Sequence, residues 1–523
     1  MPIDASCSWR RRRLLAAAWS LAGVQVLAPP HARRAWSQRF QVNPFTLGVA
    51  SGCPRPDGVV LWTRLAPEPL NGGGMPPENV TVRWELAHDE RFRNIARQGE
   101  ALATPEFAHS VHVELRGLAS DRTYWYRFIA GDGASSPGRT RTAPAPSAEP
   151  RQLRFAYASC QQYEQGYYGA YRHMAAEAVD LVVFLGDYIY ESSWGQKHVR
   201  KHSGPEPTTL AGYRDRHAQY KTDPDLQHMH ALVPWIVTWD DHEVSNDYAD
   251  MQSQYLEADF VRRRAAAYRA YYEHMPLERS MLPRGPGMRI HDRFEFGRLA
   301  LFHVLDDRQY RHAQVCPNPK FGGGSTLVRD ATCPERSDPA RSILGSAQEQ
   351  WLYAGLERSR ARWNILAQQS LMAQLDRTPG EGVSHWTDSW DGYPAARQRL
   401  LDCFAQRKPS NPIVIGGDVH SHWVCDLKQD FDRPESRTLA TEFCGTSISS
   451  QAWAQARNLE LLPDNPHVKF ASSERRGYVL VELSARECKV ALRGIDNEKD
   501  PQTGIATQAR FVVEDGHAGA QAA

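Results

Sequence analysis

Six apolar segments between residues 154 and 420 each end in polar residues, and this arrangement constrains the fold more than any other feature. They read RFAYASC, DLVVFLGD, WIVTWDDHE, LALFHVLD, WNILAQQ and NPIVIGGDVH. Helical patterns such as YYGAYRHMAAEAV and FVRRRAAAYRAYYEHM lie between them, with apolar or aromatic residues three and four positions apart. Buried strands that alternate with helices predict an α/β domain built from crossover units. In such sheets ligands bind beyond the carboxyl ends of the strands, so these polar residues are candidates for a functional site.

A region with a different pattern of apolar residues precedes these segments. From about residue 45 to residue 142 the chain carries short alternating segments, among them GVVLWTRL, VTVRWEL and TYWYRFIA, separated by turn signals such as PRPDG and NGGG. Several short strands at this spacing predict an all-β sandwich of immunoglobulin or fibronectin type. A proline-containing stretch at residues 144–150 is the expected linker to the α/β domain.

The N-terminus has the pattern of an export signal. Four arginines at residues 10–13 precede an apolar run at residues 14–28, which is shorter than the ~20 residues that a spanning helix needs. Twin arginines before such a run resemble a Tat signal, so we predict export by the Tat machinery to the periplasm or outside, without a transmembrane anchor. The alternative is a cytoplasmic protein with a basic tail. We divide the chain into a signal peptide and spacer (1–40), a β-sandwich domain (41–147), a catalytic domain that ends in a hairpin (151–495) and a C-terminal tail (496–523).

Charge and hydropathy exclude several functions. The 523 residues hold 62 Lys and Arg against 61 Asp and Glu, so the formal charge is +1 and no global field would attract nucleic acid or a charged membrane. The mean hydropathy of -0.57 argues against a polytopic membrane protein. We therefore expect no nucleic-acid-binding surface and a function that lies in local sites. We also expect a monomer.

An exported chain can form disulfides, and one pair of cysteines is well placed for one. Cys316 and Cys333 bracket a stretch rich in Gly, Pro, Ser and Asp, which gains more from a covalent tie than a packed strand does. We predict a disulfide between them. The remaining cysteines, apart from Cys7 in the signal, lie in apolar patterns and are expected to be buried and unpaired.

The ends of the first two apolar segments carry candidate metal ligands. Cys160 closes the first segment, and Asp187 and Tyr190 lie in the motif GDYIYE after the second. A carboxylate and a phenol there can bind one metal ion together, with the carboxylate free to bridge to a second. The alternatives are structural: a small buried cysteine, a strand-end Asp that caps a helix, and an ordinary core Tyr.

Two further segment ends are rich in oxygen and nitrogen ligands. The motif WDDHEVSND puts two adjacent carboxylates at a buried strand end, where they repel each other unless a cation neutralises them. In GGDVHSHW, a loop that presents both Asp418 and His420 to one cavity is favoured. The alternatives are a solvated acidic turn and a glycine turn with exposed polar residues. The residues that WDDHEVSND contributes are Asp240, Asp241, His242, Glu243 and Asn246.

These motifs resemble a known family. The order strand-Cys, GDxxY, DHE and GDxH is similar to that of the calcineurin-like metallophosphoesterases, whose motifs run GDxxY, GNHE and GHxH. The sequence is closer still to the alkaline phosphatase D family, whose blocks it matches in order from about Phe45 to Ser450. The matching blocks are FTLGVASGCPRPDGVVLWTRLAP, YASCQQYEQGYYGAYRHMA, LVVFLGDYIYE, YKTDPDLQ, PWIVTWDDHEVSNDYA, LDDRQYR, QEQWL, WDGYPAARQRLL and GGDVHSHW.

The resemblance implies an exported alkaline phosphatase or phosphodiesterase with a four-layer αββα catalytic domain that contains one ferric iron (Fe3+) and calcium (Ca2+). Its substrate would be a phosphate ester, attacked at phosphorus by a metal-activated hydroxide or oxide. By the matching positions Cys160, Tyr190 and His420 would hold the iron, with Asp187 bridging towards calcium. The candidates for the calcium side are Asp241, Asn246 and Asp418.

The types of ligand give a separate argument for two kinds of metal. Thiolate and phenolate are strongly donating anions that suit a redox-capable or highly charged ion, whereas carboxylate and amide oxygens suit calcium. Asp418 stands where the broader superfamily has the first His of GHxH. This exchange of nitrogen for oxygen shifts the second site away from zinc and towards calcium.

We assign catalytic roles to Asp187, His242 and Arg308. His242 would orient or protonate the leaving oxygen, or would instead hold a ligand carboxylate in place. Arg308, in LDDRQYR, would clamp phosphate with its fork of donors, unless it forms a structural salt bridge.

Two other functions stay open. The protein would be a calcium-dependent cell-surface binding protein if its metal cluster were only structural. It would be a metal-free hydrolase if Ser159 or Cys160 were the nucleophile, although the GxSxG elbow of one large class of such enzymes is not present.

Overall fold

The computed structural model describes residues 39–523. The expected signal peptide and spacer at residues 1–40 lie outside the described residues apart from the last two positions, so the Tat signal stays a prediction. Within the described part of the chain, no helix is both long and apolar enough to cross a membrane.

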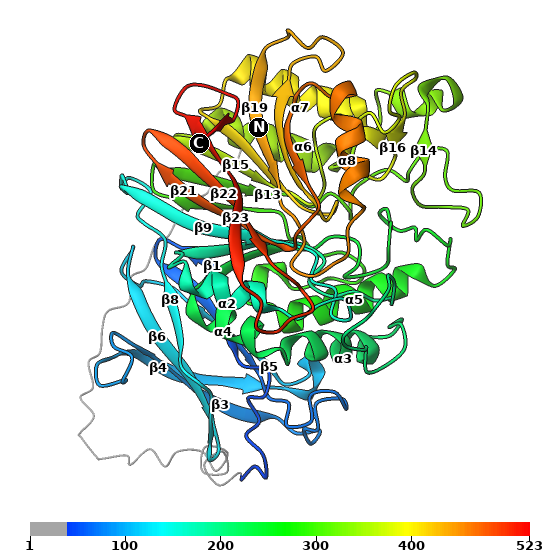
Figure 1. Cartoon of the computed structure of the whole chain (residues 1–523). Helices are drawn as coiled ribbons and strands as arrows, with labels where there is room; N and C mark the ends of the chain where they lie inside the picture. The colour runs from blue at the N-terminus through cyan, green and yellow to red at the C-terminus, as the bar shows by residue number, and fades with distance from the viewer. Residues whose placement is uncertain (1–38) are drawn as a thin grey trace, which may run out of the picture.

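Two large mixed sheets form the body of the protein (Figure 1). The strands of the first sheet, in spatial order, are β24 (Gln521–Ala522), β23 (Ile505–Glu514), β22 (Glu487–Ile495), β21 (Gly477–Ser484), β9 (Gln152–Ala158), β10 (Leu181–Leu185), β11 (Pro234–Thr238), β1 (Val49–Arg55), β2 (Gly58–Arg64) and β5 (Ser110–Leu115). Those of the second are β12 (Asp292–Phe296), β13 (Ala300–Val304), β15 (Trp363–Ala367), β17 (Pro412–Gly416), β19 (Thr438–Cys444), β18 (His422–Lys428) and β20 (Val468–Ser472).

The six apolar segments of the sequence are six of these strands, as predicted. β9, β10 and β11 are parallel neighbours in the first sheet, and β13, β15 and β17 are parallel neighbours in the second. Since parallel strands end at the same edge of a sheet, the polar residues that follow them emerge together.

The two sheets pack face to face because side chains alternate between the two faces of each strand. On β15, Ile365 and Ala367 join a core shared with the first sheet, whereas Leu366 joins a second core formed with helices. The rings of Phe155 and Phe302, one from each sheet, have centroids 5.2 Å apart. An α/β sandwich is therefore confirmed.

Helices lie against the outer faces of the sandwich (Figure 1). α6 and α7 contribute to the second core, while α2 and α4 contact strands of the first sheet. The helices are α2 (Gly169–Ala176), α3 (Leu210–Lys221), α4 (Pro224–Leu232), α5 (Phe260–His274), α6 (Gly345–Arg358), α7 (Pro394–Arg407) and α8 (Gln455–Leu461). Short 3-10 helices lie at η1 (Pro105–Phe107), η2 (Arg279–Met281), η3 (Asp330–Thr332), η4 (Pro334–Ser337), η5 (Trp390–Gly392) and η6 (Leu462–Asp464).

The N-terminal strands form a β-sandwich that shares one of its sheets with the rest of the protein. A third sheet packs against β1, β2 and β5, and Leu61, Val82 and Phe128 lie in the core between them. We expected the β-sandwich domain to end and the catalytic domain to begin at residues 147–151. One sheet continues across this boundary, because β1 of the N-terminal part pairs in parallel with β11 of the catalytic part. The third sheet consists of β4 (Ile95–Ala103), β3 (Val80–Ala87), β6 (Thr123–Ala130), β7 (Gly133–Ala134) and β8 (Gly138–Arg141). Its immunoglobulin or fibronectin type stays a prediction.

The C-terminal end of the chain also differs from expectation. The hairpin of β21 and β22 forms as predicted, but residues 496–523 are not a tail. They contain β23, which pairs with β22 along its length, and β24 at the edge of the sheet. Alternation in IATQARFVVE is weak, with Phe511 and Val513 the buried positions of this strand, so the sequence pattern did not predict it.

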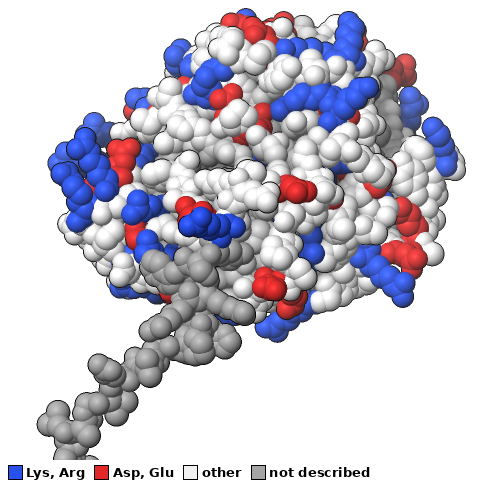
Figure 2. All heavy atoms as spheres, turned by 90° about the horizontal axis from the view of Figure 1, so that it is seen from below, with Lys and Arg blue, Asp and Glu red and all other residues white. Residues whose placement is uncertain are grey.

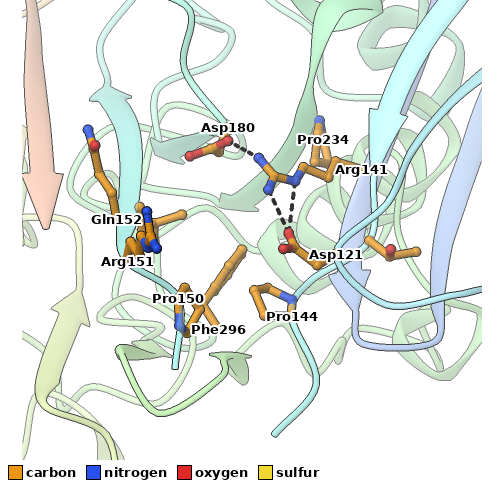
Figure 3. A pocket seen from close by; sticks show the side chains of 11 residues that line it. Asp121, Arg141, Pro144, Pro150, Arg151, Gln152, Asp180, Pro234 and Phe296 are labelled. Atoms are coloured by element: carbon orange, nitrogen blue, oxygen red, sulfur yellow. Dashed lines mark hydrogen bonds and ion pairs between the residues drawn. The ribbon is translucent and has the colours of Figure 1, made fainter. Parts of the chain in front are cut away.

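A crevice of about 270 Å³ lies where the linker crosses the amino ends of the strands (Figure 3). Arg141 at the end of β8 forms ion pairs there with Asp121 and with Asp180, which precedes β10. Gln152 at the start of β9 and Pro234 at the start of β11 also line it. This crevice is at the opposite edge of the sheet from the candidate site residues, so it belongs to the junction of the two parts.

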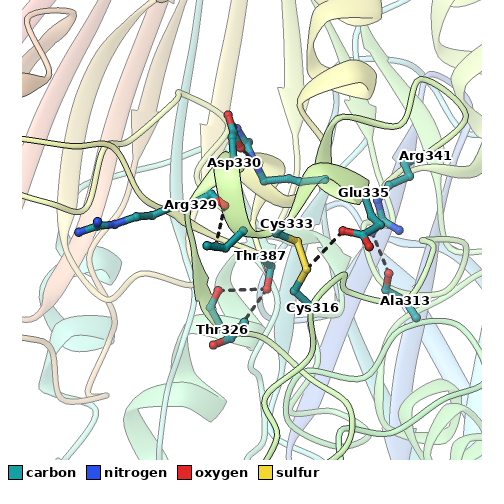
Figure 4. Close-up of a disulfide and its surroundings, with 11 residues drawn as sticks. Ala313, Cys316, Thr326, Arg329, Asp330, Cys333, Glu335, Arg341 and Thr387 are labelled. Carbon is teal, nitrogen blue, oxygen red and sulfur yellow. Dashed lines mark hydrogen bonds and ion pairs between the residues drawn. A yellow bond between two sulfur atoms is a disulfide. The ribbon is translucent and has the colours of Figure 1, made fainter.

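The predicted disulfide between Cys316 and Cys333 is present, with Cα atoms 6.1 Å apart (Figure 4). The six other cysteines in the described residues are free and buried, also as predicted. A fourth sheet has only two strands, β14 (Leu327–Val328) and β16 (His385–Trp386). It holds the disulfide loop against the segment that follows β15.

The charged side chains of the face in Figure 2 are interspersed. Lys and Arg form groups at the left edge and the upper right of this view, Asp and Glu are scattered among them, and broad uncharged areas lie between. This view agrees with the near-zero formal charge, which gave no reason to expect a nucleic-acid-binding surface.

Lys221, at the end of α3, is buried at the junction with the N-terminal strands. Its ammonium nitrogen lies 4.4 Å from the ring centroid of Trp62 on β2 and 5.3 Å from that of Tyr188. Burial lowers the pKa of Lys221 from 10.5 to about 7. The folded protein therefore binds this proton more weakly than the unfolded chain does.

We predict that Lys221 makes the free energy of unfolding rise with pH between about 7 and 10.5. In that window the unfolded chain carries a proton on this residue that the folded protein has lost, so stability increases by up to about 1.4 kcal/mol per pH unit. Denaturant unfolding of Lys221→Met across about pH 7 to 9 should lack this contribution, whereas the exposed control Lys201→Met should keep it. Parallel pH profiles for the wild type and Lys221→Met would contradict the assignment.

Candidate active site

The carboxyl ends of the parallel strands surround one cleft of about 790 Å³. Cys160 and Tyr190 do not line this cleft but contact residues that do. Arg308 does not line it either. The predicted site residues that line it are Asp187, Asp241, His242, Asn246, Asp418 and His420.

Four of the predicted ligands have left-handed backbone conformations. The φ angles are 59° for Cys160, 57° for Asp187, 66° for Asp418 and 54° for His420. Non-glycine residues adopt this region rarely, and each instance costs on the order of 1 kcal/mol or more. Each lies just after a strand, so the backbone turns sharply and aims the side chain sideways. Asp418 and His420 can therefore face one cavity, which a regular strand would not allow.

The first cluster contains the four residues expected around iron. The ligand atoms of Cys160, Asp187 and His420 all lie within 4.8 Å of one another. The Tyr190 hydroxyl donates to Asp187 Oδ2 at 2.7 Å and lies 3.2 Å from His420 Nε2. His420 Nδ1 is 2.7 Å from the carbonyl oxygen of Gln451, which fixes it as the N–H and leaves Nε2 with the free electron pair. The structure thus brings together side chains from three strand ends.

The carboxylates extend this cluster along the cleft. Asp187 also belongs to a group with Asp241 and His242, and Asp241 in turn belongs to a group with Asp240 and Asp418. Asp187 and Asp241 are shared members, so the groups form one continuous chain of ligands. A last group joins Asp241 to two residues that were not among the predicted ligands, Asp247 and Asp388.

Asn246, the predicted amide ligand, lines the same cleft. Its side-chain nitrogen donates to Gln254 Oε1 at 3.1 Å. Because this bond occupies the nitrogen, the amide oxygen of Asn246 is left as the free donor atom for a cation.

The electrostatics of this cluster favour a cation. Burial, together with the neighbouring carboxylates, raises the pKa values of Asp187, Asp240 and Asp418 well above the ordinary range. Burial likewise raises the pKa of the Cys160 thiol and lowers that of His420 to about 3. Asp187 Oδ1 and Asp240 Oδ2 are buried without a hydrogen-bond partner. A bound cation would satisfy these oxygens and relieve the repulsion.

Arg308 forms the structural salt bridge that was its alternative role. Its guanidinium is buried and pairs with Asp240, with Asp388 at 2.6 Å and with Asp418 at 3.3 Å. These carboxylates hold the pKa of Arg308 well above its usual value, although burial acts against the charged form. Its donors are directed to the carboxylates of candidate ligands and it does not line the cleft, so the geometry favours the structural role of Arg308 over the phosphate clamp.

Glu243 of the DDHE motif ties two strand ends together. Its carboxylate accepts the backbone N–H of Tyr188 at 2.6 Å, that of Asp240 at 2.8 Å and that of Asp187 at 3.1 Å. Gly186 permits this approach, because a Cβ there would lie 2.4 Å from Cβ of Asp240 and its φ is 108°. The motif therefore contains one brace as well as candidate ligands.

His242 is held by Glu191, which lies in the GDYIYE motif but was not among the predicted site residues. Its Nδ1 lies 2.7 Å from Glu191 Oε2, and its ring centroid is 4.2 Å from that of Tyr190. Burial would raise the pKa of Glu191, but the His242 ring outweighs it and the pKa falls to about 2. Glu191 also accepts the Asn246 N–H at 2.8 Å. The position of Glu191 at the end of GDYIYE did not by itself indicate a role in the site, because the residues it contacts follow another strand.

A serine-rich loop after β19, residues 445–454, touches three of the iron-side candidates and was not predicted as part of the site. Ser450 Oγ lies 2.8 Å from the Tyr190 hydroxyl and 2.8 Å from the Cys160 carbonyl oxygen. Gln451 supplies the carbonyl that orients His420. The sequence could have indicated this loop, because the polar segment CGTSISSQ follows an apolar strand just as the other motifs do.

The disulfide loop forms another wall of the cleft. Ser325, between Cys316 and Cys333, donates both its backbone N–H, at 2.9 Å, and its hydroxyl to Asp247 Oδ2. Phe321 of the same loop lines the cleft. The covalent tie therefore fixes a segment that contacts the carboxylate cluster.

The fold and cleft define a class: α/β sandwich proteins with a cleft at the carboxyl ends of two facing sheets, lined by side chains that could hold metal ions. Within this class the chain belongs to the PhoD-like phosphatase family. The family model for PhoD-like phosphatase matches residues 155–492, and the model for the N-terminal domain of PhoD-like phosphatase matches residues 30–144. Membership places the chain among the phosphoric ester hydrolases, as the sequence motifs implied.

Two relatives support this placement along nearly the whole chain. Alkaline phosphatase D of Bacillus subtilis (strain 168) is 47% identical over 511 residues, which cover 96% of this chain and 84% of the relative. A solved structure described as the structure of PhoD matches with a TM-score of 0.88 and 46% identity, over 93% of each chain. The similarity therefore includes both the N-terminal strands and the cleft.

We predict that Glu191→Gln lowers kcat for a phosphate ester by about 10- to 100-fold while leaving the metal content unchanged. The amide keeps an acceptor oxygen but removes the negative charge that faces the His242 ring, so it holds and charges the ring less strongly. Turnover and elemental analysis of the same preparations check this. Glu206→Gln is the matched control, since Glu206 lines the cleft but pairs with Arg263 at 2.6 Å. An equal loss in both variants would count against a specific role for Glu191.

Proposed function

We propose that the protein is an exported, metal-dependent alkaline phosphatase or phosphodiesterase that hydrolyses phosphate esters in this cleft. The observation that carries the proposal is the continuous chain of ligand groups, in which Asp187 belongs both to the cluster of Cys160 and His420 and to that of Asp241 and His242. Its four-layer αββα metallophosphoesterase architecture, with periplasmic or secreted localisation after Tat export, forms part of the same proposal.

The first cluster fits ferric iron by its donor types. Cys160 and Tyr190 would supply a thiolate and a phenolate, His420 a neutral imidazole nitrogen, and Asp187 a carboxylate. Anionic sulfur and phenolate donors suit a highly charged, redox-capable ion. The buried thiol and phenol have strongly raised pKa values, so only a strong Lewis acid would deprotonate them near neutral pH.

The rest of the chain of carboxylates fits calcium. Asp241 and Asp418 offer carboxylate oxygens and Asn246 offers an amide oxygen, which are hard donors without imidazole. Asp187 would then bridge the two kinds of site. When bound, these cations neutralise phosphate oxygens and activate water as a nucleophile.

The protein's own residues would orient the ester and move a proton. His242 lines the cleft with Nδ1 held by Glu191. Although burial disfavours the charged ring, the neighbouring carboxylates of Glu191, Asp187 and Asp241 raise the pKa of His242 well above its ordinary value. Both ring nitrogens therefore carry protons, and Nε2 would donate to the leaving oxygen. Arg308 and Glu243 act indirectly, because they fix the carboxylates and strand ends that face the substrate. The cluster around Asp187 and Asp241 sets the position of the ester.

The alternative functions receive less support from this geometry. Ser159 and Cys160 do not line the cleft, and the Cys160 thiol donates to Ser159 Oγ at 3.1 Å with a raised pKa, so neither is placed as a free nucleophile. A calcium-dependent binding protein would need the ligands but no open cleft above them. Cleavage of an ester therefore separates the enzyme from a binding protein.

We predict that Cys160→Ala abolishes bound iron and reduces hydrolysis by several powers of ten, because both charge neutralisation and activation of the nucleophile depend on the cluster. Elemental analysis and the rate with a chromogenic phosphomonoester measure the two effects. Cys488→Ala is the matched control, since Cys488 is also buried and free but lies on β22. Full activity with unchanged iron in Cys160→Ala would refute the ligand set.

We also predict that a calcium chelator abolishes hydrolysis of chromogenic mono- and diesters and that added calcium restores it. Removal of the cation leaves the carboxylates of Asp241 and Asp418 without a counter-charge, so the thermal midpoint should fall as well. Activity that survives exhaustive chelation would favour the metal-free nucleophile. A calcium-dependent midpoint without any hydrolysis would favour the binding protein.

A further inference from the structure

The cleft is strongly acidic, and one basic side chain stands out in it. In the described structure, Arg377 is the only Arg or Lys among the residues that line the cleft. The other arginines of this region lie behind the wall, where Arg308 and Arg311 are buried and paired with Asp388. Arg377 is on the segment between β15 and β16, outside every motif of the sequence.

Arg377 keeps a donor that no protein group satisfies. No carboxylate of the described chain forms an ion pair with it, and its Nε is buried without a hydrogen-bond partner. Burial lowers the pKa of Arg377 to about 10, so the side chain is still charged at neutral pH. A guanidinium with a buried, unsatisfied donor is unfavourable unless a ligand completes it.

The backbone around Arg377 is firmly held. Its N–H donates to the Ser384 carbonyl oxygen at 2.9 Å. The neighbouring Asp376 carboxylate accepts the N–H of Thr378 at 2.9 Å and that of Ser384 at 3.0 Å. These bonds close the turn that carries Arg377, so the residue starts from a defined position at the cleft.

An aromatic side chain positions the guanidinium. Arg377 Cζ lies 4.8 Å from the ring centroid of Trp453, which also lines the cleft. Trp453 belongs to the serine-rich loop, close to the carbonyl of Gln451 that orients His420. The guanidinium and the candidate iron cluster are thus connected through one loop. Arg457 packs on the same indole at 3.9 Å but does not line the cleft.

We propose that Arg377 binds a non-bridging phosphoryl oxygen of the ester, and of product phosphate, while Trp453 holds the guanidinium in place. A planar fork of donors matches phosphate oxygens, and Arg377 offers its guanidinium at the cleft wall, where no carboxylate of the described chain pairs with it. The inference rests on the proposed function, because it names the residue that recognises the phosphate of that substrate. It also replaces Arg308 as the arginine that meets the substrate.

The test compares Arg377→Gln with Arg457→Gln, which removes the other arginine from the same indole. Inorganic phosphate is titrated into each protein by calorimetry, and KM, kcat and phosphate inhibition are measured with a chromogenic phosphomonoester. Because a charged hydrogen bond is lost, Arg377→Gln should weaken phosphate binding and raise KM by about 10- to 100-fold, with a smaller change in kcat. Arg377→Lys should be intermediate, since it keeps the charge but loses the fork.

The controls separate this inference from the proposed function. Arg457→Gln should bind phosphate as the wild type does, and the metal content and thermal midpoint should be unchanged in all variants. An active wild type with equal phosphate affinity in Arg377→Gln and Arg457→Gln would overturn the inference alone. A wild type that hydrolyses no ester would overturn the proposed function, and the phosphate titration would still decide whether Arg377 binds the anion.

Discussion

The repulsion among buried carboxylates at the strand ends is the constraint on which the rest of this structure depends. Asp187, Asp240 and Asp418 meet in one cluster, and burial and mutual repulsion raise their pKa values well above the ordinary range. Arg308 supplies one positive charge from behind, which is too little for so many acids. In their ionised form these acids would need further positive charge, so the way the fold concentrates negative charge favours cations in the cleft.

The fold stabilises this cluster by surrounding it with braces, side chains and carbonyl groups that hydrogen-bond to the backbone or side chains of the cluster. Four of the predicted ligands occupy left-handed backbone conformations that are unfavourable in isolation, and neighbouring groups hold them there. Glu243 ties the ends of β10 and β11, and the serine-rich loop ties the first sheet to the second through Ser450 and Gln451. The strain is local and the braces come from distant parts of the chain. A change in a brace therefore alters the site without touching a ligand.

The difference between residues at strand ends and the distant groups that hold them explains which parts of the site were predictable from the sequence. The six strands follow local patterns, which placed Cys160, Asp187 and His420 at strand ends. Their grouping around one ion was implied by the family resemblance. Glu191 and Arg377 contact residues that are distant in sequence, so no motif spacing indicates that they belong to the site. The pairing of β1 with β11 and the strand β23 were not predicted for the same reason, since both depend on contacts between separate segments rather than on alternation within one segment.

The shared ligands couple the two halves of the cluster. Asp187 and Asp241 each belong to more than one group, so a cation at either group neutralises a carboxylate that also faces the next group. A first cation would orient the shared oxygens, but it would also weaken the negative potential that attracts a second cation. Occupancy of one position would therefore change the affinity of the other for a cation. Through Asp187, the side chains of Cys160 and Tyr190, which do not line the cleft, contact the carboxylates that do.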